Sequence, residues 1–420
     1  MKKKAIVLSL FLLQCYCVTG GRTVFGMDGN PVVLLLSSLF IAILFISLLR
    51  KGKLETGSYK SDPGKKAIGF AAGVAAIGIC IPAFSNLLSA YPNPGEISDV
   101  LPQIDALYTR YASGKFPYYP LEEFDWKPYP VYMPLNWLPL AISYYLKTDI
   151  RWTGIIAMAI ANGIWGIFLW QRDATLVTKL ISLLMPAIII LSFIGFSGMD
   201  IAVSLETLIA AYYIILAIGI ANNNLLLITI GLILCLLSRY TMVFWLPLFG
   251  IIGFQQMALK KNIIMWLSVL AAILVIYIIP FYLKDPSILQ QGIAYHNKCA
   301  VSEWTGHGNP PIAYIFSAGI YLGSYFKTIL PGDNATQVFI MRSIQGLLMA
   351  VLNVWGIWYY RKHNGMYYPY YLVVMLYLFV LLFYLFSPML FKYYHIVTLS
   401  LSAVLCSIMI TQYQPEPSIK

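Results

Sequence analysis

Long apolar runs separated by short polar segments make up most of this chain. The runs are about 20 residues long, which is the length a helix needs to cross the hydrocarbon core of a bilayer. The pattern therefore predicts an all-α membrane protein with about twelve transmembrane helices. The predicted spans lie at about residues 5–19, 31–49, 67–89, 152–170, 178–196, 201–220, 224–238, 240–258, 262–283, 338–360, 367–387 and 391–411.

The composition supports the same class. The 420 residues are 60% hydrophobic and only 11% charged, with a mean hydropathy of +0.74. A soluble chain of this length needs far more charge to cover its surface. We therefore expect one polytopic membrane domain over residues 1–420.

The net charge of +11 is unevenly distributed. If the N-terminus is cytoplasmic, the predicted cytoplasmic segments hold 16 Lys and Arg but only 4 Asp and Glu, against 12 and 13 in the rest of the chain. Cytoplasmic loops of membrane proteins retain positive charge. The asymmetry predicts that both termini are cytoplasmic, and it indicates topology rather than nucleic-acid binding.

The N-terminal stretch "MKKKAIVLSLFLLQCYCVTGG" resembles a signal peptide, with a basic start and a short apolar core. A second apolar run follows almost at once, which favours a first transmembrane helix. Whether the segment is cleaved stays open.

Two polar segments on the predicted outer side are too long to be simple turns: residues 90–151 and 284–337. Loops of this length are usually functional or disordered, and their many aromatic residues argue against disorder. Each contains an apolar stretch, 132–146 and 312–330. We expect both stretches to lie at the membrane interface, although 312–330 is long enough to cross.

The first of these loops begins with "SDVLPQIDALYTRYASGKFPYYP". A carboxylate beside a membrane cleft can act as a general base, and Asp99 and Asp105 are the candidates. Aromatic faces near carboxylates suit carbohydrate recognition. An interfacial aromatic belt explains single tyrosines equally well, and most loop aspartates are simply solvated.

Three features of this loop, taken in order, resemble the GT-C membrane glycosyltransferases, in particular the bacterial polyprenyl-phosphate-dependent, mannosyltransferase-like branch. Asp99 follows a span and precedes Gly114 by 15 residues, Pro117 and Tyr118 come next, and Tyr129 and Pro130 open an interfacial segment. Where that family often has Tyr-Pro-Pro-Leu, this chain has "YMPL". The specific motif covers only about 45 residues, whereas the topology matches over the whole chain.

The resemblance implies that Asp99 is the catalytic base, with Asp105 as a second candidate. It implies a polyprenyl-phosphate sugar as donor and a glycan or glycolipid as acceptor. Some members of the superfamily use a divalent metal ion and others do not, so a metal cofactor stays open. In the first loop, the candidate substrate contacts are Arg110, Tyr118, Tyr119 and Tyr129.

Charged groups at membrane depth are expensive and tend to be functional. Glu206 is predicted six residues inside a span, with Arg239 as its candidate partner. Arg239 and Lys392 each suit the donor phosphate, because a cation stabilises a leaving phosphate, but snorkelling to the headgroups is an equal alternative. The resemblance supports a basic residue near Lys392 and His395.

The second loop contains "HNKCAVSEWTGH". On a helix, His296, Cys299, Glu303 and His307 share one face and are zinc-ligand types. A substrate-contacting or solvated segment is the favoured interpretation, with His296 as the substrate contact.

Together with the charge distribution, the resemblance implies a plasma (inner) membrane enzyme that transfers a hexose outside the cytoplasm, with inversion. A membrane transporter or lipid flippase explains Glu206 and Arg239 but gives the long loops no role. A polysaccharide polymerase shares both the loops and the lipid substrate.

Overall fold

The apolar runs form helices, because a helix satisfies its backbone N–H and C=O groups within the segment, as a lipid environment requires. The computed structural model describes residues 2–55, 62–122, 124, 127–305, 320–363 and 365–414, and it is 79% helical with no strand in this part of the chain. Eight of the described helices are long and apolar enough to cross a membrane, and two shorter apolar helices accompany them.

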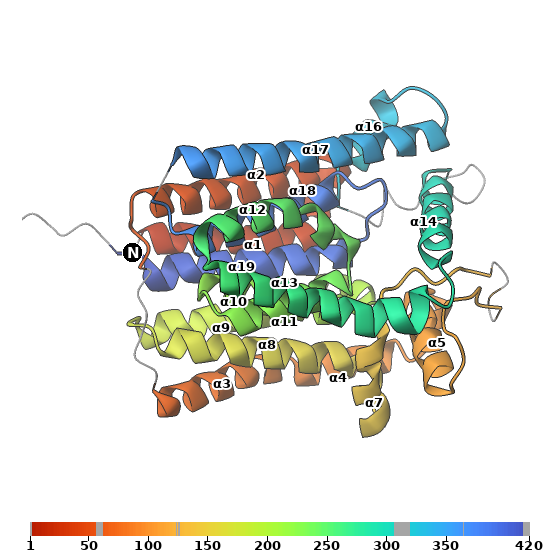
Figure 1. Cartoon of the computed structure of the whole chain (residues 1–420), viewed down its shortest axis with the longest axis horizontal. Coiled ribbons are helices and arrows are strands. Elements are labelled where there is room, and N and C mark those ends of the chain that lie inside the picture. The colour runs from red at the N-terminus through yellow and green to blue at the C-terminus, as the bar shows by residue number, and fades with distance from the viewer. Residues whose placement is uncertain are drawn as a thin grey trace, which may run out of the picture.

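The helices that form the bundle run roughly parallel to one another (Figure 1). They are α1 (Lys2–Thr19), α2 (Arg22–Arg50), α3 (Pro63–Gly78), α4 (Ile81–Ala90), α8 (Trp152–Trp170), α9 (Leu176–Ala202), α10 (Glu206–Ala221), α11 (Leu225–Leu236), α12 (Leu246–Gln256), α13 (Leu259–Ile273) with its π-helical continuation η4 (Leu274–Tyr282), α17 (Asn334–Lys362), α18 (Tyr368–Leu385) and α19 (His395–Gln412).

The remaining helices gather at one end of the bundle, which we call the loop end. Of these, α5, α7 and α14 run across the bundle direction (Figure 1). The helices of the loop end are η1 (Pro94–Glu96), α5 (Val100–Ala112), α6 (Pro134–Trp137), η2 (Leu138–Leu140), α7 (Ala141–Leu146), η3 (Tyr240–Phe244), α14 (Ile288–Thr305), α16 (Gly323–Ile329) and η5 (Lys392–Tyr394).

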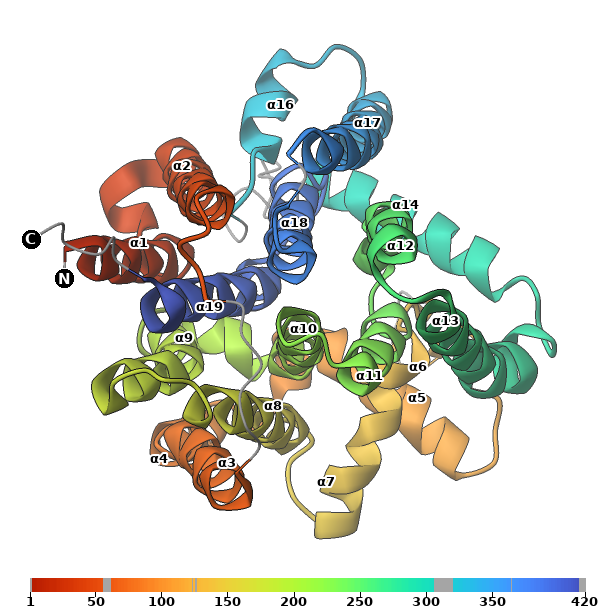
Figure 2. The same cartoon turned by 60° about the vertical axis from the view of Figure 1, so that its left-hand side comes forward.

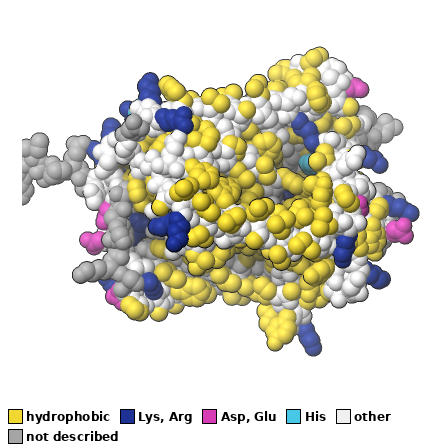
Figure 3. Space-filling model, viewed as in Figure 1, with side chains coloured by type: hydrophobic (Ala, Val, Ile, Leu, Met, Phe, Trp, Pro, Cys, Tyr) yellow, Lys and Arg dark blue, Asp and Glu magenta, His cyan; other side chains and the backbone are white. Residues whose placement is uncertain are grey.

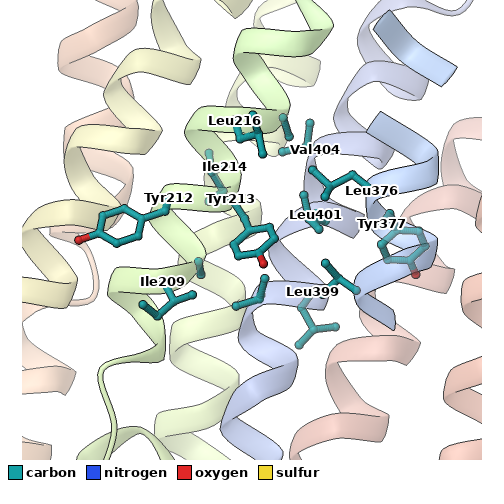
Figure 4. Close-up of a cluster of buried hydrophobic side chains, with 14 of the residues drawn as sticks. Ile209, Tyr212, Tyr213, Ile214, Leu216, Leu376, Tyr377, Leu399, Leu401 and Val404 are labelled. Atoms are coloured by element: carbon teal, nitrogen blue, oxygen red, sulfur yellow. The ribbon is translucent and has the colours of Figure 1, made fainter. Parts of the chain in front are cut away.

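Three helices form the centre of the bundle: α10, α18 and α19 (Figure 2). Every residue of α10 and of α19 is buried. Apolar side chains and tyrosines of the three helices interdigitate, among them Tyr213, Leu376 and Leu401 (Figure 4). By contrast, only 17% of the most apolar window of Leu259–Tyr282 and 22% of that of α17 is buried, so these helices are peripheral.

Glycines bring α3 and α8 into backbone contact. A Cβ at Gly73 would lie 2.2 Å from the carbonyl oxygen of Asn162, and one at Gly166 would lie 1.9 Å from that of Gly69. The Asn162 side chain donates hydrogen bonds to the carbonyls of Gly73 and Leu183 at 2.8 and 3.0 Å. Small residues and interhelical hydrogen bonds of this kind hold helices together in lipid, where no hydrophobic drive acts between them.

Several predicted boundaries differ from the structure. Helix α9 continues to Ala202, with non-helical backbone at Ser197, so Asp200 lies in its last turn. Glu206 is the first residue of α10 rather than a residue inside a helix. The stretch 132–146 is divided into α6, η2 and α7, because Pro134 and Pro139 interrupt helical hydrogen bonding. Of 312–330, residues 312–319 lie outside the described part.

We predict that Gly166→Ala destabilises the protein by about 1–3 kcal/mol, the usual effect of overpacking, because the new methyl group must separate α3 from α8. Thermal unfolding in detergent micelles measures this. The matched control is Gly346→Ala in α17, where a Cβ meets nothing within 4 Å, and it should leave the midpoint unchanged or slightly raised. Equal midpoints for Gly166→Ala and wild type would contradict the packing.

Candidate functional site

Charged and titratable side chains from six separate segments lie at the loop end, and we call them the loop-end charge cluster. They come from the start of α5, the start of α10, the residue before η3, η5, and the facing helices α14 and α17. The members are Asp99, Glu206, Arg239, His296, Arg342 and Lys392.

Glu206 and Arg239 form a buried ion pair at the centre of this cluster. The carboxylate of Glu206 lies at the N-terminus of α10, where the helix dipole favours negative charge. Arg239 has extended backbone, with φ −142° and ψ 130°, between α11 and η3. Its guanidinium lies 4.7 Å from the ring centre of Tyr394, a cation–π distance. The sequence-predicted partnership of Glu206 with Arg239 is therefore present.

Tyrosines surround this ion pair. Tyr132, Tyr384, Tyr393 and Tyr394 all lie close enough to Arg239 to interact with its charge. Tyr132 is also near Asp99, so it connects the carboxylate of the first loop to the ion pair. Burial, then the neighbouring Tyr394 and Asp99, raise the pKa of Tyr132. Its hydroxyl therefore stays protonated and able to donate a hydrogen bond.

Asp99 lies directly before α5 and is half-buried. Its Oδ2 accepts a 2.7 Å hydrogen bond from Nε2 of Gln103, one helical turn later. Its charge also acts on Tyr295 and Cys299 of α14. Among the described residues, no hydrogen bond reaches Oδ1, so this oxygen can accept a proton from a bound hydroxyl.

Asp105 has different neighbours. Its Oδ1 accepts a 2.6 Å hydrogen bond from the hydroxyl of Tyr144 in α7. Burial raises the pKa of Asp105, with nearby Asp149 adding to the effect and the Tyr144 hydrogen bond opposing it. The two predicted carboxylates thus have separate partners, and the structure does not join them in one site.

Arg110 and Tyr119 hold the first loop to α5. The buried Arg110 guanidinium donates to the carbonyl oxygens of Pro117, Tyr119 and Pro120 at 3.3, 2.9 and 3.2 Å. It also lies 3.8 Å from the ring centre of Tyr119. These contacts are made to the protein itself, and they fix the path of the loop.

Tyr118 and Tyr129 are buried beneath the same loop. The Tyr118 hydroxyl donates to the carbonyl of Tyr132 at 2.9 Å and accepts from Nε1 of Trp137 at 3.2 Å. Burial, then the charge of Asp285, raise the pKa of Tyr129 to about 12. Tyr118 therefore holds the backbone of Tyr132 in place through this hydrogen bond instead of contacting the loop-end charge cluster.

Lys392 and His395 start the final helical segment. The Lys392 ammonium is near the carboxylate of Asp200 at the end of α9. His395 is fully buried, and its Nε2 donates to the carbonyl oxygen of Ile320 at 2.7 Å. Lys392 thus belongs to the cluster, whereas His395 ties α19 to the second loop.

His296 and Arg342 complete the cluster from α14 and α17. Burial, then the positive charges of Arg342 and Arg239, lower the pKa of His296. His296 is nevertheless exposed at the surface, so solvent screens the effect strongly. Figure 3 shows this face hollowed near the loop end, between α17 and α14, with basic and histidine side chains at the edge. Arg342 was missing from the predicted site, although a charge inside the predicted span 338–360 was a usable signal.

The predicted zinc-type face is only partly described. His296, Cys299 and Glu303 lie on α14, whereas His307 lies outside the described residues. In the part of the chain that the structure covers, no group of three or more His, Cys, Asp and Glu side chains is placed to hold a metal ion.

Comparison of the chain with protein-family models, curated proteins and solved structures found no match.

We predict that Glu206→Gln destabilises the protein by about 3–5 kcal/mol, because it leaves the Arg239 charge buried without its carboxylate. The double variant Glu206→Gln, Arg239→Gln should recover much of that loss. Thermal unfolding of the single and double variants completes a double-mutant cycle. Additive effects in this cycle would show that the two side chains do not stabilise each other.

Proposed function

We propose that the chain is a GT-C-like membrane glycosyltransferase that transfers a hexose from a polyprenyl-phosphate donor to a glycan or glycolipid acceptor. The observation that carries the proposal is the convergence at the loop end. Asp99, the residue that matches the family's catalytic aspartate, lies beside Tyr132, which adjoins Arg239 and Tyr394. The structure thus brings a carboxylate and cationic side chains together from segments far apart in sequence, which supports the proposal.

The proposed topology has twelve spans with both termini in the cytoplasm of a plasma (inner) membrane protein. The shorter helices α10, α11 and α12 count as spans in this arrangement, as does α1. The distribution of Lys and Arg supports it, and so do α5, α7 and α14, which run across the bundle as helices in the membrane interface do. The loop end then faces outside.

In the proposed reaction, Asp99 takes the proton of an acceptor hydroxyl, and the oxygen attacks the anomeric carbon of the donor. The bond from that carbon to the phosphate oxygen breaks, and the lipid phosphate leaves with both electrons. Attack opposite the leaving group inverts the anomeric centre. Cations of the loop-end charge cluster stabilise the charge that develops on the phosphate.

A transporter or lipid flippase is the main alternative class. Its support in the sequence was the pair of intramembrane charges, Glu206 and Arg239. The structure pairs these side chains with each other, so neither requires a transported ion or substrate as its partner. A polysaccharide polymerase remains the alternative with the same donor chemistry, and it differs only in whether the acceptor chain grows repeatedly.

We predict that Asp99→Asn lowers sugar transfer by about 100- to 10,000-fold, the usual contribution of a general base. Purified protein would be given a radiolabelled polyprenyl-phosphate hexose and membrane acceptors. Asp105→Asn is the matched control, because it removes the other carboxylate of α5 and should retain most of the transfer.

Each outcome of this assay decides between the functions. Unchanged transfer by Asp99→Asn would eliminate the proposed base. Passage of the lipid across a liposome membrane without bond cleavage would favour the flippase, and products of many added sugars would favour the polymerase.

We predict that Gln103→Leu lowers kcat about tenfold or more, because the charged Asp99 carboxylate loses a hydrogen bond of roughly 1.5–3 kcal/mol. The KM for the donor should stay the same, because Gln103 orients the carboxylate of Asp99. A purely structural effect would instead lower the unfolding temperature and the fraction of active protein. Gln291→Leu, at an exposed position of α14, is the control.

A further inference from the structure

Two of the three strong cations in the loop-end charge cluster already have a carboxylate. Arg239 pairs with Glu206, and Lys392 is near Asp200. These were the residues that the sequence proposed for the donor phosphate. The Arg239 charge is balanced by its ion pair, and the Lys392 charge has a carboxylate in its neighbourhood.

Arg239 keeps one buried nitrogen atom, Nε, without a hydrogen-bond partner among the described residues, whereas Arg342 keeps two, Nε and Nη2. Burying guanidinium nitrogen atoms without acceptors is unfavourable in an apolar environment. A side chain retained in this state is expected to meet its acceptors on a ligand.

The unpartnered atoms have a useful geometry. Nε and Nη2 form one edge of the guanidinium plane, and such an edge donates two parallel hydrogen bonds to two oxygens of a carboxylate or phosphate. A carboxylate of the protein does not occupy this edge in the described structure. The neighbouring groups on the packed helix α14 include His296, which also interacts with Arg239.

The position of Arg342 is not explained by helix packing. Other polar side chains fix α17 to the bundle: Gln345 donates to the carbonyl of Phe383 at 2.7 Å, and Asn353 donates to that of Phe244 at 2.9 Å. Helix α17 is peripheral and exposes apolar side chains on either side of Arg342 in sequence, Phe339 and Leu347. The arginine is thus placed beside the surface that meets the acyl chains of a membrane.

We propose that Arg342 binds the phosphate group of a lipid-linked phosphate ester that enters from the bilayer beside α17. The identification of this lipid as the sugar donor rests on the proposed function. The binding site itself rests on the unpartnered guanidinium edge and on the place of Arg342 in α17, which packs against α14. Arg239 and His296 then form the side of the proposed binding site that lies next to Tyr132 and Asp99.

Binding of radiolabelled polyprenyl phosphate, carrying no sugar, to the full-length protein in lipid nanodiscs tests the proposal. Arg342→Gln should weaken binding by about 10-fold or more, the effect of losing charge-assisted hydrogen bonds. Arg361→Gln is the control, because it removes an exposed arginine from the same helix. Uncharged polyprenol should bind both variants and the wild type equally, and inorganic phosphate should compete only weakly.

A stability measurement separates a ligand site from a structural role. Arg342→Gln should unfold at the wild-type temperature or above it, because the unpartnered charge is removed. Wild-type affinity in Arg342→Gln would overturn the proposal, and so would an equal loss of polyprenol binding or a large drop in stability. Competition by inorganic phosphate as strong as that of the lipid would show a free-phosphate site instead.

The same variants distinguish this inference from the proposed function. Arg342-dependent lipid binding without any sugar transfer by the wild-type protein would retain the site and reject the glycosyltransferase. Sugar transfer with an unchanged donor KM in Arg342→Gln would retain the enzyme and reject the site.

Discussion

The buried ion pair of Glu206 and Arg239 organises the loop end of this protein. Glu206 begins α10, the most central helix, and Arg239 ends the connection from α11, so the pair fixes where the core stops and the loops begin. An unpaired charge at this depth is strongly unfavourable, so Arg239 is held beside Glu206. The position of Arg239 in turn determines which aromatic rings contact its guanidinium. Tyr394 lies against the guanidinium, and Tyr132 extends the contact to the first loop.

Charge balance, rather than charge alone, determines which cations are available to a ligand. Sequence reasoning ranks Arg239 and Lys392 highest, since both lie at membrane depth. In the structure each has a nearby carboxylate, and Arg342 has unpartnered nitrogen atoms instead. An arginine whose hydrogen bonds are already made within the protein holds the fold, as Arg110 does with three loop carbonyls.

The helical bundle was largely predictable, because a length of about 20 apolar residues is a strong signal. The partnership of Glu206 with Arg239 was also predicted. The predicted position of Glu206 inside a span was wrong. An apolar run carries no signal of the non-helical backbone at Ser197 or of the extension of α9 to Ala202. The roles of Tyr118 and Arg110 were not predictable, since a buried tyrosine that holds the backbone of Tyr132 and a tyrosine that stacks on a sugar look alike in sequence.

The proposed chemistry requires that the first loop is held in place and that helix α17 packs loosely. The first loop is held by Arg110 and by a cluster of Tyr118, Trp137 and Phe281 rings with centres 5.3 to 6.3 Å apart. A base on such a loop keeps its position from one turnover to the next, which favours catalysis by orientation. Helix α17 makes few buried contacts along its apolar window, so the proposed lipid would reach Arg342 from the bilayer side of the molecule. A transporter that works by alternating access would instead require this fixed first loop to move.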